Sequence, residues 1–210
     1  MKAKGLLGIL LLSVFLMAGC EKEPEAPENL LAEEIQVETL YLRADGTVQS
    51  AYVEEFGKSY YQESELRSFM DEMIAAYNES NGTNLVELTQ LRASGGKVYA
   101  ILTYQDVAAY AEFNTHFGEK TAAMLAEAVN VDTAKERYGN LSFYDVKKKA
   151  EKNGSEILTG KNQGIAVIQG PIEVQTSGNV LYYSEGNLTG TRTLTIPENT
   201  EAVIVYKKES

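Results

Sequence analysis

Apolar and polar residues alternate in two stretches of the first half of the chain, as expected for strands with one buried face. The first stretch predicts strands over residues 36–43 and 47–55, joined at Asp45-Gly46, because glycine accepts the positive φ of a tight turn. The second stretch, residues 84–104, is interrupted in the same way by Ser94-Gly95-Gly96. Each stretch is therefore expected to form a β-hairpin.

The segment between these hairpins, SELRSFMDEMIAAYNESNG, changes to helical spacing. Ser64 is expected to cap a helix and Gly82 to end it. The apolar residues recur three and four positions apart, at Leu66, Phe69, Met70, Met73 and Tyr77. Two hairpins around one amphipathic helix form a β-β-α-β-β unit, in which a sheet packed on the helix buries both apolar faces.

Residues 105–153 are expected to be helical. One helix is predicted after Asp106, a second over residues 118–129, and a third after Ser142, where Asp145 resembles part of a capping box. The chain's one basic run falls near the end of this third helix, where positive charge suits the helix dipole, at Lys147, Lys148, Lys149 and Lys152. A solvated helix end is favoured for these lysines over a contact with phosphate or teichoic acid.

From Gly164 onward the chain consists of short β-rich runs separated by Gly, Pro and Asn, and Pro171 is expected to start an edge strand. The expected fold is α+β: antiparallel hairpins packed on an amphipathic helix, a helical middle and a β-rich C-terminal segment. A single domain is expected over residues 35–208. The alternative is a pair of subdomains, 35–153 and 160–208.

The first twenty residues have a different organisation. Lys2 and Lys4 precede a run from Leu6 to Ala18 that is almost wholly apolar. This run has about 13 residues, whereas a helix needs roughly 20 to span a bilayer. The pattern therefore predicts a secretory signal peptide over residues 1–19, followed directly by the single cysteine, Cys20.

The stretch Leu16-Met17-Ala18-Gly19-Cys20 resembles the lipobox of bacterial lipoproteins, with Met17 where that family prefers Leu. The resemblance implies cleavage before Cys20 and a diacylglycerol on its sulfur, which would anchor the protein at the extracytoplasmic face of the cell membrane. The alternatives are an ordinary secreted protein with a chance cysteine, or a buried free thiol. More loosely, the Pro/Glu-rich segment, Tyr60-Tyr61 before a helix and the ending VIVYKK resemble uncharacterised small surface lipoproteins of gut Firmicutes.

The acidic, proline-containing residues 20–34 are expected to form an extended tether, with a reach of about 45 Å for 14 residues. The net charge of the chain is −11, and it becomes more negative when Lys2 and Lys4 are removed with the signal peptide. Such a chain is expected to bind no nucleic acid and to repel anionic headgroups. Contact with the membrane is therefore expected only through the acyl chains on Cys20.

The sequence predicts no catalytic, cofactor-binding or metal-binding residue, and no cofactor. His116 is the only histidine, and no Gly-x-Ser-x-Gly elbow accompanies it, so a surface position is favoured over a general base. Transition-metal sites need several His or Cys ligands, and EF-hand spacing is missing from the sequence. Most of the 13 tyrosines occupy strand-like or helical apolar positions and are expected in the core, although tyrosine-rich surfaces can bind glycans or peptides.

Two functions are weighed. The first is a lipid-anchored, non-enzymatic binding or structural module with an unknown protein or glycan partner. The alternative is a carboxylate-dependent hydrolase of cell-wall or glycan polymers, which requires two acids that face each other in a cleft. A ligand-capturing lipoprotein of a transporter is disfavoured, because two-lobed receptors need a longer chain with parallel β-α-β units.

Replacing Cys20 by serine is expected to release the protein from the membrane fraction into the medium, because the sulfur that would carry the diacylglycerol is lost. Fractionation of cells that express the wild type or the C20S variant, followed by immunoblotting, measures this. A variant that remained in the membrane fraction would contradict the lipid anchor.

Overall fold

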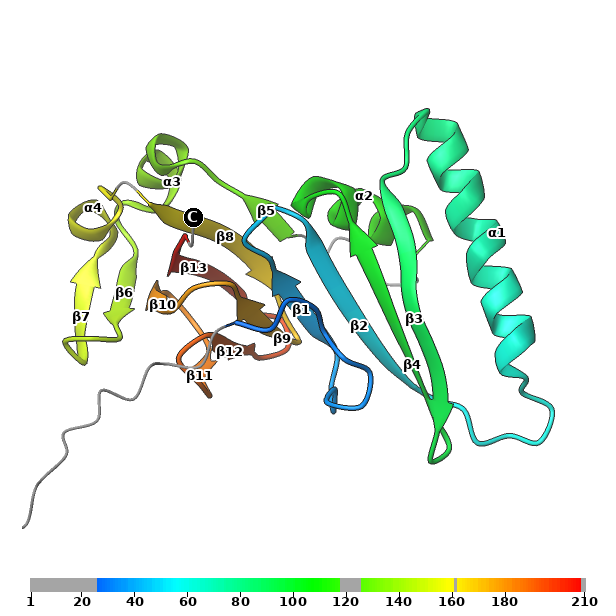
Figure 1. The fold of residues 1–210 in the computed structure, drawn as a ribbon. Helices are drawn as coiled ribbons and strands as arrows, with labels where there is room; N and C mark the ends of the chain where they lie inside the picture. The colour runs from blue at the N-terminus through cyan, green and yellow to red at the C-terminus, as the bar shows by residue number, and fades with distance from the viewer. Residues whose placement is uncertain (1–25, 118–125, 161, 209–210) are drawn as a thin grey trace, which may run out of the picture.

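The computed structural model of the protein describes residues 26–117, 126–160 and 162–208 (Figure 1). These residues form an α+β fold of two sheets and four helices, α1 (Glu63–Asn81), α2 (Val107–Phe117), α3 (Val131–Tyr138) and α4 (Gly154–Ile157). Apart from one parallel pair of strands, both sheets are antiparallel. The expected α+β class is therefore confirmed.

The first sheet combines the two N-terminal hairpins with three strands of the C-terminal segment. Its order is β11-β12-β9-β1-β2-β4-β3. The bounds are β1 (Thr39–Leu42), β2 (Val48–Glu55), β3 (Val86–Ser94), β4 (Lys97–Tyr104), β9 (Ile172–Thr176), β11 (Asn187–Leu188) and β12 (Thr193–Ile196). Strand β1 pairs antiparallel with β2 and parallel with β9, so it joins the N-terminal hairpins to the C-terminal segment.

The second sheet has the order β5-β8-β13-β10-β6-β7. Its bounds are β5 (Ala126–Ala128), β6 (Ser142–Asp145), β7 (Ala150–Asn153), β8 (Gln163–Gln169), β10 (Val180–Tyr183) and β13 (Glu201–Lys207). Alternate residues of a strand point to opposite faces. Ala166 and Ile168 of β8 therefore join the core shared with the first sheet, whereas Ile165 and Val167 join a second core with residues of α3 and α4. Burial on both faces explains the continuous apolar runs of β8 and β13.

The predicted N-terminal unit is confirmed as two hairpins and one helix. Helix α1 ends at Gly82, which has the left-handed φ of 68° that favours glycine. Ser64 is not the cap, because the helix begins after Gln62, whose side chain makes no capping hydrogen bond. Phe69 was expected in the core but is 62% exposed. The buried residues of α1 are Ile74 and Tyr77.

The middle of the chain is less helical than predicted. Helix α2 follows Asp106 as expected, and Asp106 Oδ1 accepts a hydrogen bond from the Ala109 N–H at 2.8 Å. Of the helix predicted over 118–129, residues 118–125 lie outside the described residues. Ala126–Ala128 form β5 instead, because they pair with β8.

The helix predicted after Ser142 is wrong, because β6 and β7 form a hairpin there. Phe143 and Asp145 are both buried, which is the period of a strand. Tertiary burial of Phe143 thus overrides the helix propensity of the lysine-rich stretch. Asp145 holds the hairpin turn, because its carboxylate accepts a hydrogen bond from the Lys148 N–H at 2.9 Å.

The β-rich runs predicted after Gly164 are strands, but Pro171 does not start an edge strand. Strand β9 begins at the next residue and lies inside the sheet, between β12 and β1. Proline is compatible with this position because it precedes the first paired residue, Ile172, and removes no ladder hydrogen bond.

Residues 26–35, called the N-terminal strap below, pack on the outer face of the first sheet. Leu30, Ala32 and Ile35 are buried there against residues that include Tyr41 and Ile101. The expected tether over residues 20–34 therefore does not extend to residue 34, because its second half is part of the folded structure. Apolar residues in the strap bury the sheet face that the helices leave uncovered.

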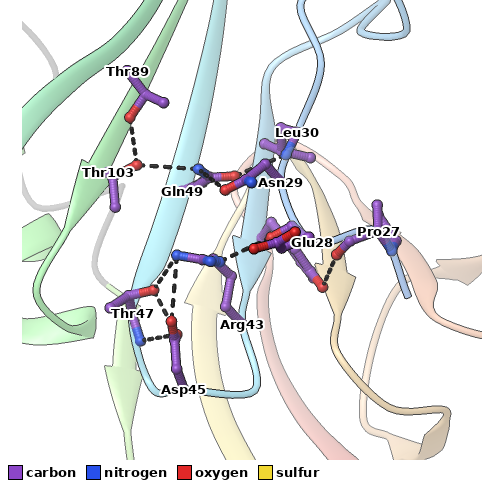
Figure 2. A network of polar contacts seen from close by, with 11 residues as sticks. Pro27, Glu28, Asn29, Leu30, Arg43, Asp45, Thr47, Gln49, Thr89 and Thr103 are labelled. Atoms are coloured by element: carbon purple, nitrogen blue, oxygen red, sulfur yellow. Dashed lines mark hydrogen bonds and ion pairs between the residues drawn. The ribbon is translucent and has the colours of Figure 1, made fainter. Parts of the chain in front are cut away.

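Hydrogen bonds hold residues 27–30 of the strap to the first sheet (Figure 2). Gln49 of β2 is completely buried, and its side-chain oxygen accepts a hydrogen bond from the Leu30 N–H at 2.8 Å. Its amide nitrogen donates to Asn29 Oδ1 at 3.0 Å and to Thr103 Oγ1 at 3.1 Å. Each polar atom of the Gln49 amide group therefore has a partner, which buried polar groups require.

Leu30→Ala is expected to lower the free energy of unfolding by about 2–5 kcal/mol, because it leaves a cavity under the strap. The neighbouring Leu31 is the matched control, since it is 38% exposed against 3% for Leu30. Leu31→Ala should change stability by less than about 0.5 kcal/mol. Urea denaturation of both variants measures the difference, and equal stabilities would contradict a docked strap.

Candidate functional site

The residues singled out in the sequence are not brought together by the structure. Cys20 lies outside the described residues. His116 is exposed in the last turn of α2, and its ring lies edge-on to that of Phe117, with centroids 4.5 Å apart. Within the described residues, no group of three or more His, Cys, Asp or Glu side chains is placed to hold a metal ion. The chemistry must therefore be sought on other surfaces.

Carboxylates line a groove of about 920 Å³ between α1 and β3. Asp71 and Glu79 in this groove are eight residues apart on α1, which corresponds to about 12 Å along the helix axis. The two backbone positions are thus farther apart than the roughly 9.5 Å that separates the carboxyl groups of an inverting glycosidase. This pair does not meet the requirement of the hydrolase alternative. Glu87 of β3 also lines the groove, but its side chain is exposed rather than enclosed in a cleft.

A second acidic groove, of about 480 Å³, lies between α2 and β5 and contains Asp106, Glu112 and Glu127. Asp106 caps α2, and Glu127 forms an ion pair with Arg137 at 2.7 Å. Two of the three carboxylates thus have structural partners. This groove also gives no support to an acid-pair hydrolase.

The tyrosines give a clearer indication, because all 13 lie in the described part of the chain and only two are exposed. Tyr52, Tyr104 and Tyr110 form an interior group, in which Tyr52 donates a hydrogen bond to Asn114 and the Tyr104 hydroxyl lies 3.1 Å from Ser50 Oγ. Burial raises the pKa of these three phenols, so they stay neutral at physiological pH. They belong to the core, as expected for most of the tyrosines.

The two exposed tyrosines are consecutive. Tyr60 is 66% exposed and Tyr61 is 39% exposed. Both lie in the connection between β2 and α1, residues 56–62, which is called the aromatic loop below. Large exposed aromatic side chains on a loop are typical of binding surfaces, because they offer contact area at little conformational cost.

The aromatic loop is built outward from the core. Phe56 packs on the core, and its N–H donates a hydrogen bond of 2.6 Å to the Gly96 carbonyl in the β3–β4 turn. The Tyr61 ring stacks on Phe56 with centroids 4.9 Å apart, and Tyr60 lies edge-on to Tyr61 at 5.0 Å. The partly buried ring of Phe56 therefore supports the ring of Tyr61, which in turn supports the more exposed ring of Tyr60.

A positive charge lies beside these rings. The Lys58 ammonium is 5.8 Å from the Tyr60 ring centroid and 5.7 Å from that of Tyr61, within range of a cation–π interaction. Hydrogen bonding to Tyr60, followed by the charge interaction with Tyr61, raises the pKa of Lys58. The loop thus presents apolar ring faces, phenolic hydroxyls and one ammonium group on the same surface.

The aromatic loop and the beginning of the strap lie at opposite ends of the first sheet. Glu55 at the end of β2 pairs with Lys97, next to the β3–β4 turn that holds the loop. At the other end, the Tyr41 hydroxyl donates to the Pro27 carbonyl at 2.7 Å, and Arg43 Nε donates to the Glu28 carbonyl at 3.1 Å. Figure 1 shows the β1–β2 connection at one end of β2 and the β2–α1 connection at the other.

The chain has no match among protein-family models, curated proteins or solved structures. Among the residues that the structure describes, no helix combines the length and apolarity needed to cross a bilayer. A function can therefore be argued only from the residues of this chain. The sequence shows the dipeptide Tyr60-Tyr61, but it does not show that these two side chains are exposed. The other tyrosines of the chain are buried or half-buried.

Tyr60→Ser is expected to change the free energy of unfolding by less than about 0.5 kcal/mol, because an exposed ring leaves no cavity when it is removed. Tyr104, which is fully buried, provides the contrast. Tyr104→Ala should cost about 3–5 kcal/mol. Chemical denaturation of both variants tests this, and a large loss for Tyr60→Ser would mean that this ring has a structural role.

Proposed function

We propose that the protein is a non-enzymatic binding module, held by acyl chains on Cys20 at the extracytoplasmic face of a bacterial membrane, with the aromatic loop as its binding surface. The anchor rests on the lipobox-like stretch that ends at Cys20. The binding surface rests on the exposure of Tyr60 and Tyr61 in a chain whose other tyrosines are buried or half-buried.

The observation that carries the proposal is the position of the loop relative to the strap. The strap begins near the β1–β2 turn, and the loop follows the last residue of β2. The eight residues of β2 separate these two places, a distance of about 26 Å at the rise of a strand. A lipid attached ahead of the strap would hold one end of the sheet near the bilayer and leave the aromatic loop at the distant end.

A glycan is the ligand class that suits the loop best. Sugar rings have apolar C–H faces that can pack on tyrosine rings, and hydroxyl groups that can bond with phenols and an ammonium group. Lys58, Tyr60 and Tyr61 present these groups together. Wall polymers and other envelope glycans would be within reach of a protein anchored in this way.

The hydrolase alternative gains no supporting observation from the described grooves. The acids on α1 are about 12 Å apart along the axis, and Glu87 on the other side of that groove is exposed. Two acids beside α2 have structural partners. The aromatic loop itself contains no Asp or Glu between residues 56 and 62. Binding without catalysis is therefore the function that these residues support.

Soluble wall glycans at about 100 times their dissociation constant are expected to stabilise the protein by about 2.7 kcal/mol, which corresponds to a rise of several degrees in Tm. The Tyr60→Ser/Tyr61→Ser variant should lose this rise. Phe69→Ser is the matched control, because Phe69 is an equally exposed aromatic residue outside the loop. Thermal unfolding with a panel of wall fragments and soluble glycans makes the measurement.

Two outcomes would contradict the proposal. An unchanged Tm across the glycan panel would exclude this ligand class. A shift that persists in Tyr60→Ser/Tyr61→Ser would place the binding surface elsewhere on the molecule.

A further inference from the structure

Basic residues gather around the turn between β9 and β10, residues 177–179, although the chain as a whole is acidic. Six of them come from four separate parts of the sequence, Arg43, Lys147, Lys148, Arg192, Lys207 and Lys208. This set is called the basic end below. Only the two lysine pairs are neighbours in sequence, so the grouping is a product of the fold.

Contacts with the turn place each residue. Arg192 Nε donates a hydrogen bond to Asn179 Oδ1 at 3.2 Å, and the Lys207 N–H donates to the Asn179 carbonyl at 2.9 Å. Lys147 and Lys148 line a cavity of about 620 Å³ together with Asn179. Arg43 and Lys208 line another, of about 480 Å³, together with Ser177.

The acidic residues of this region do not cancel the charge. Asp45 forms an ion pair with Arg43 at 3.4 Å, and Asp145 is buried beneath the β6–β7 turn. Glu28 of the strap is exposed and lines a cavity together with Arg43, so three acidic residues stand against the six basic ones. Among the described residues, no ion pair engages Lys147, Lys148, Lys207 or Lys208, and all four are exposed. Glu209, which follows Lys208 in the sequence, lies outside the described residues. The described surface around the turn is thus predominantly positive.

The first residues of the strap lie beside the basic end. Ala26 lines a cavity of about 320 Å³ together with Arg43 and Ser177. The chain from Cys20 to Ala26 can span at most about 20 Å, even when fully extended. The tether expected from the sequence had a reach of about 45 Å, so the docked strap brings this end of the domain much closer to any lipid on Cys20.

We propose that the basic end docks on the anionic headgroups of the membrane that carries the anchor. The inference rests on the proposed lipid anchor and adds an orientation to it. Lysines within a Debye length of an anionic bilayer, about 8–10 Å, are attracted to it even when the whole protein is acidic, because more distant charges are screened. This contact holds the basic end toward the bilayer and the aromatic loop away from it. In Figure 1 the β6–β7 hairpin, which carries Lys147 and Lys148, lies at the left and the β2–α1 connection at the right.

The test uses the chain from Cys20 onward, coupled through its single thiol to a maleimide-bearing diacyl lipid in vesicles. Chemical coupling makes the result independent of whether cells lipidate Cys20, which the fractionation of C20S tests separately. The vesicles contain phosphatidylcholine alone or with 30 mol% phosphatidylglycerol. The rate at which an amine-reactive reagent labels each lysine is then measured by mass spectrometry.

We expect labelling of Lys147, Lys148 and Lys207 to be at least about threefold slower on the anionic vesicles. The difference should disappear in 0.5 M NaCl, because salt screens the attraction. Lys58 and Lys97, at the end that carries the aromatic loop, should be labelled at the same rate on both vesicles.

Matched variants complete the test. Lys147→Gln/Lys148→Gln should abolish the protection of Lys207, whereas Lys58→Gln/Lys97→Gln should preserve it. Equal labelling of Lys147, Lys148 and Lys207 on the two vesicle types would overturn the proposal. Equal protection of every lysine, including Lys58, would also overturn it, because the basic end would then have no special orientation.

Discussion

The short strand β1 is the element on which the rest of the structure depends. All four of its residues, Thr39–Leu42, are buried. It pairs with β2 on one side and with β9 on the other, so its backbone joins the N-terminal hairpins to the C-terminal segment. One face of β1 contributes Leu40 to the central core, and the other contributes Tyr41 to the cluster beneath the strap. Because β1 has hydrogen-bonded strands on both edges and buried contacts on both faces, its position depends on all of these elements together.

The strap determines how the domain relates to whatever precedes it. Gln49 lies at the centre of its attachment, because its side chain binds Asn29, Leu30 and Thr103 at once. Separating the strap from the sheet is costly, because it would break the hydrogen bonds between Gln49 and the strap and expose the apolar cluster beneath it to water. The strap therefore fixes the place at which the chain enters the domain, next to the β1–β2 turn.

This entry point gives the molecule two chemically different ends. The entry end carries the basic residues around Ser177 and Asn179, whereas the far end carries stacked aromatic rings. The negative net charge of the whole chain does not reveal this arrangement, because a net charge contains no information on where the charged residues lie. The proposed orientation at a membrane and the proposed binding surface would thus both follow from the packing of the strap on the first sheet.

Local sequence patterns predicted part of this fold correctly. They failed where the burial of a side chain against distant residues determines the secondary structure. The turn at Asp45-Gly46 and the C-terminal Gly82 of α1 depend on backbone preferences of adjacent residues, so they were predictable. The β6–β7 hairpin was mistaken for a helix because its lysines suit a helix end, and the burial of Phe143 that overrides them involves residues distant in sequence. Phe69 was expected in the core but is exposed. Helical spacing identifies the apolar stripe of α1, but it does not reveal which side of the stripe packs against β3.

What the sequence by itself determined are the features that depend on neighbouring residues. These are the two lysines and the apolar run that precede Cys20, the N-terminal hairpins and α1. Only the tertiary structure decided that residues 26–35 form a strap, that Tyr60 and Tyr61 alone among the tyrosines are exposed, and that six basic residues meet at one turn. The physical reason is that burial and charge grouping arise from contacts between residues far apart along the chain, which no local pattern contains.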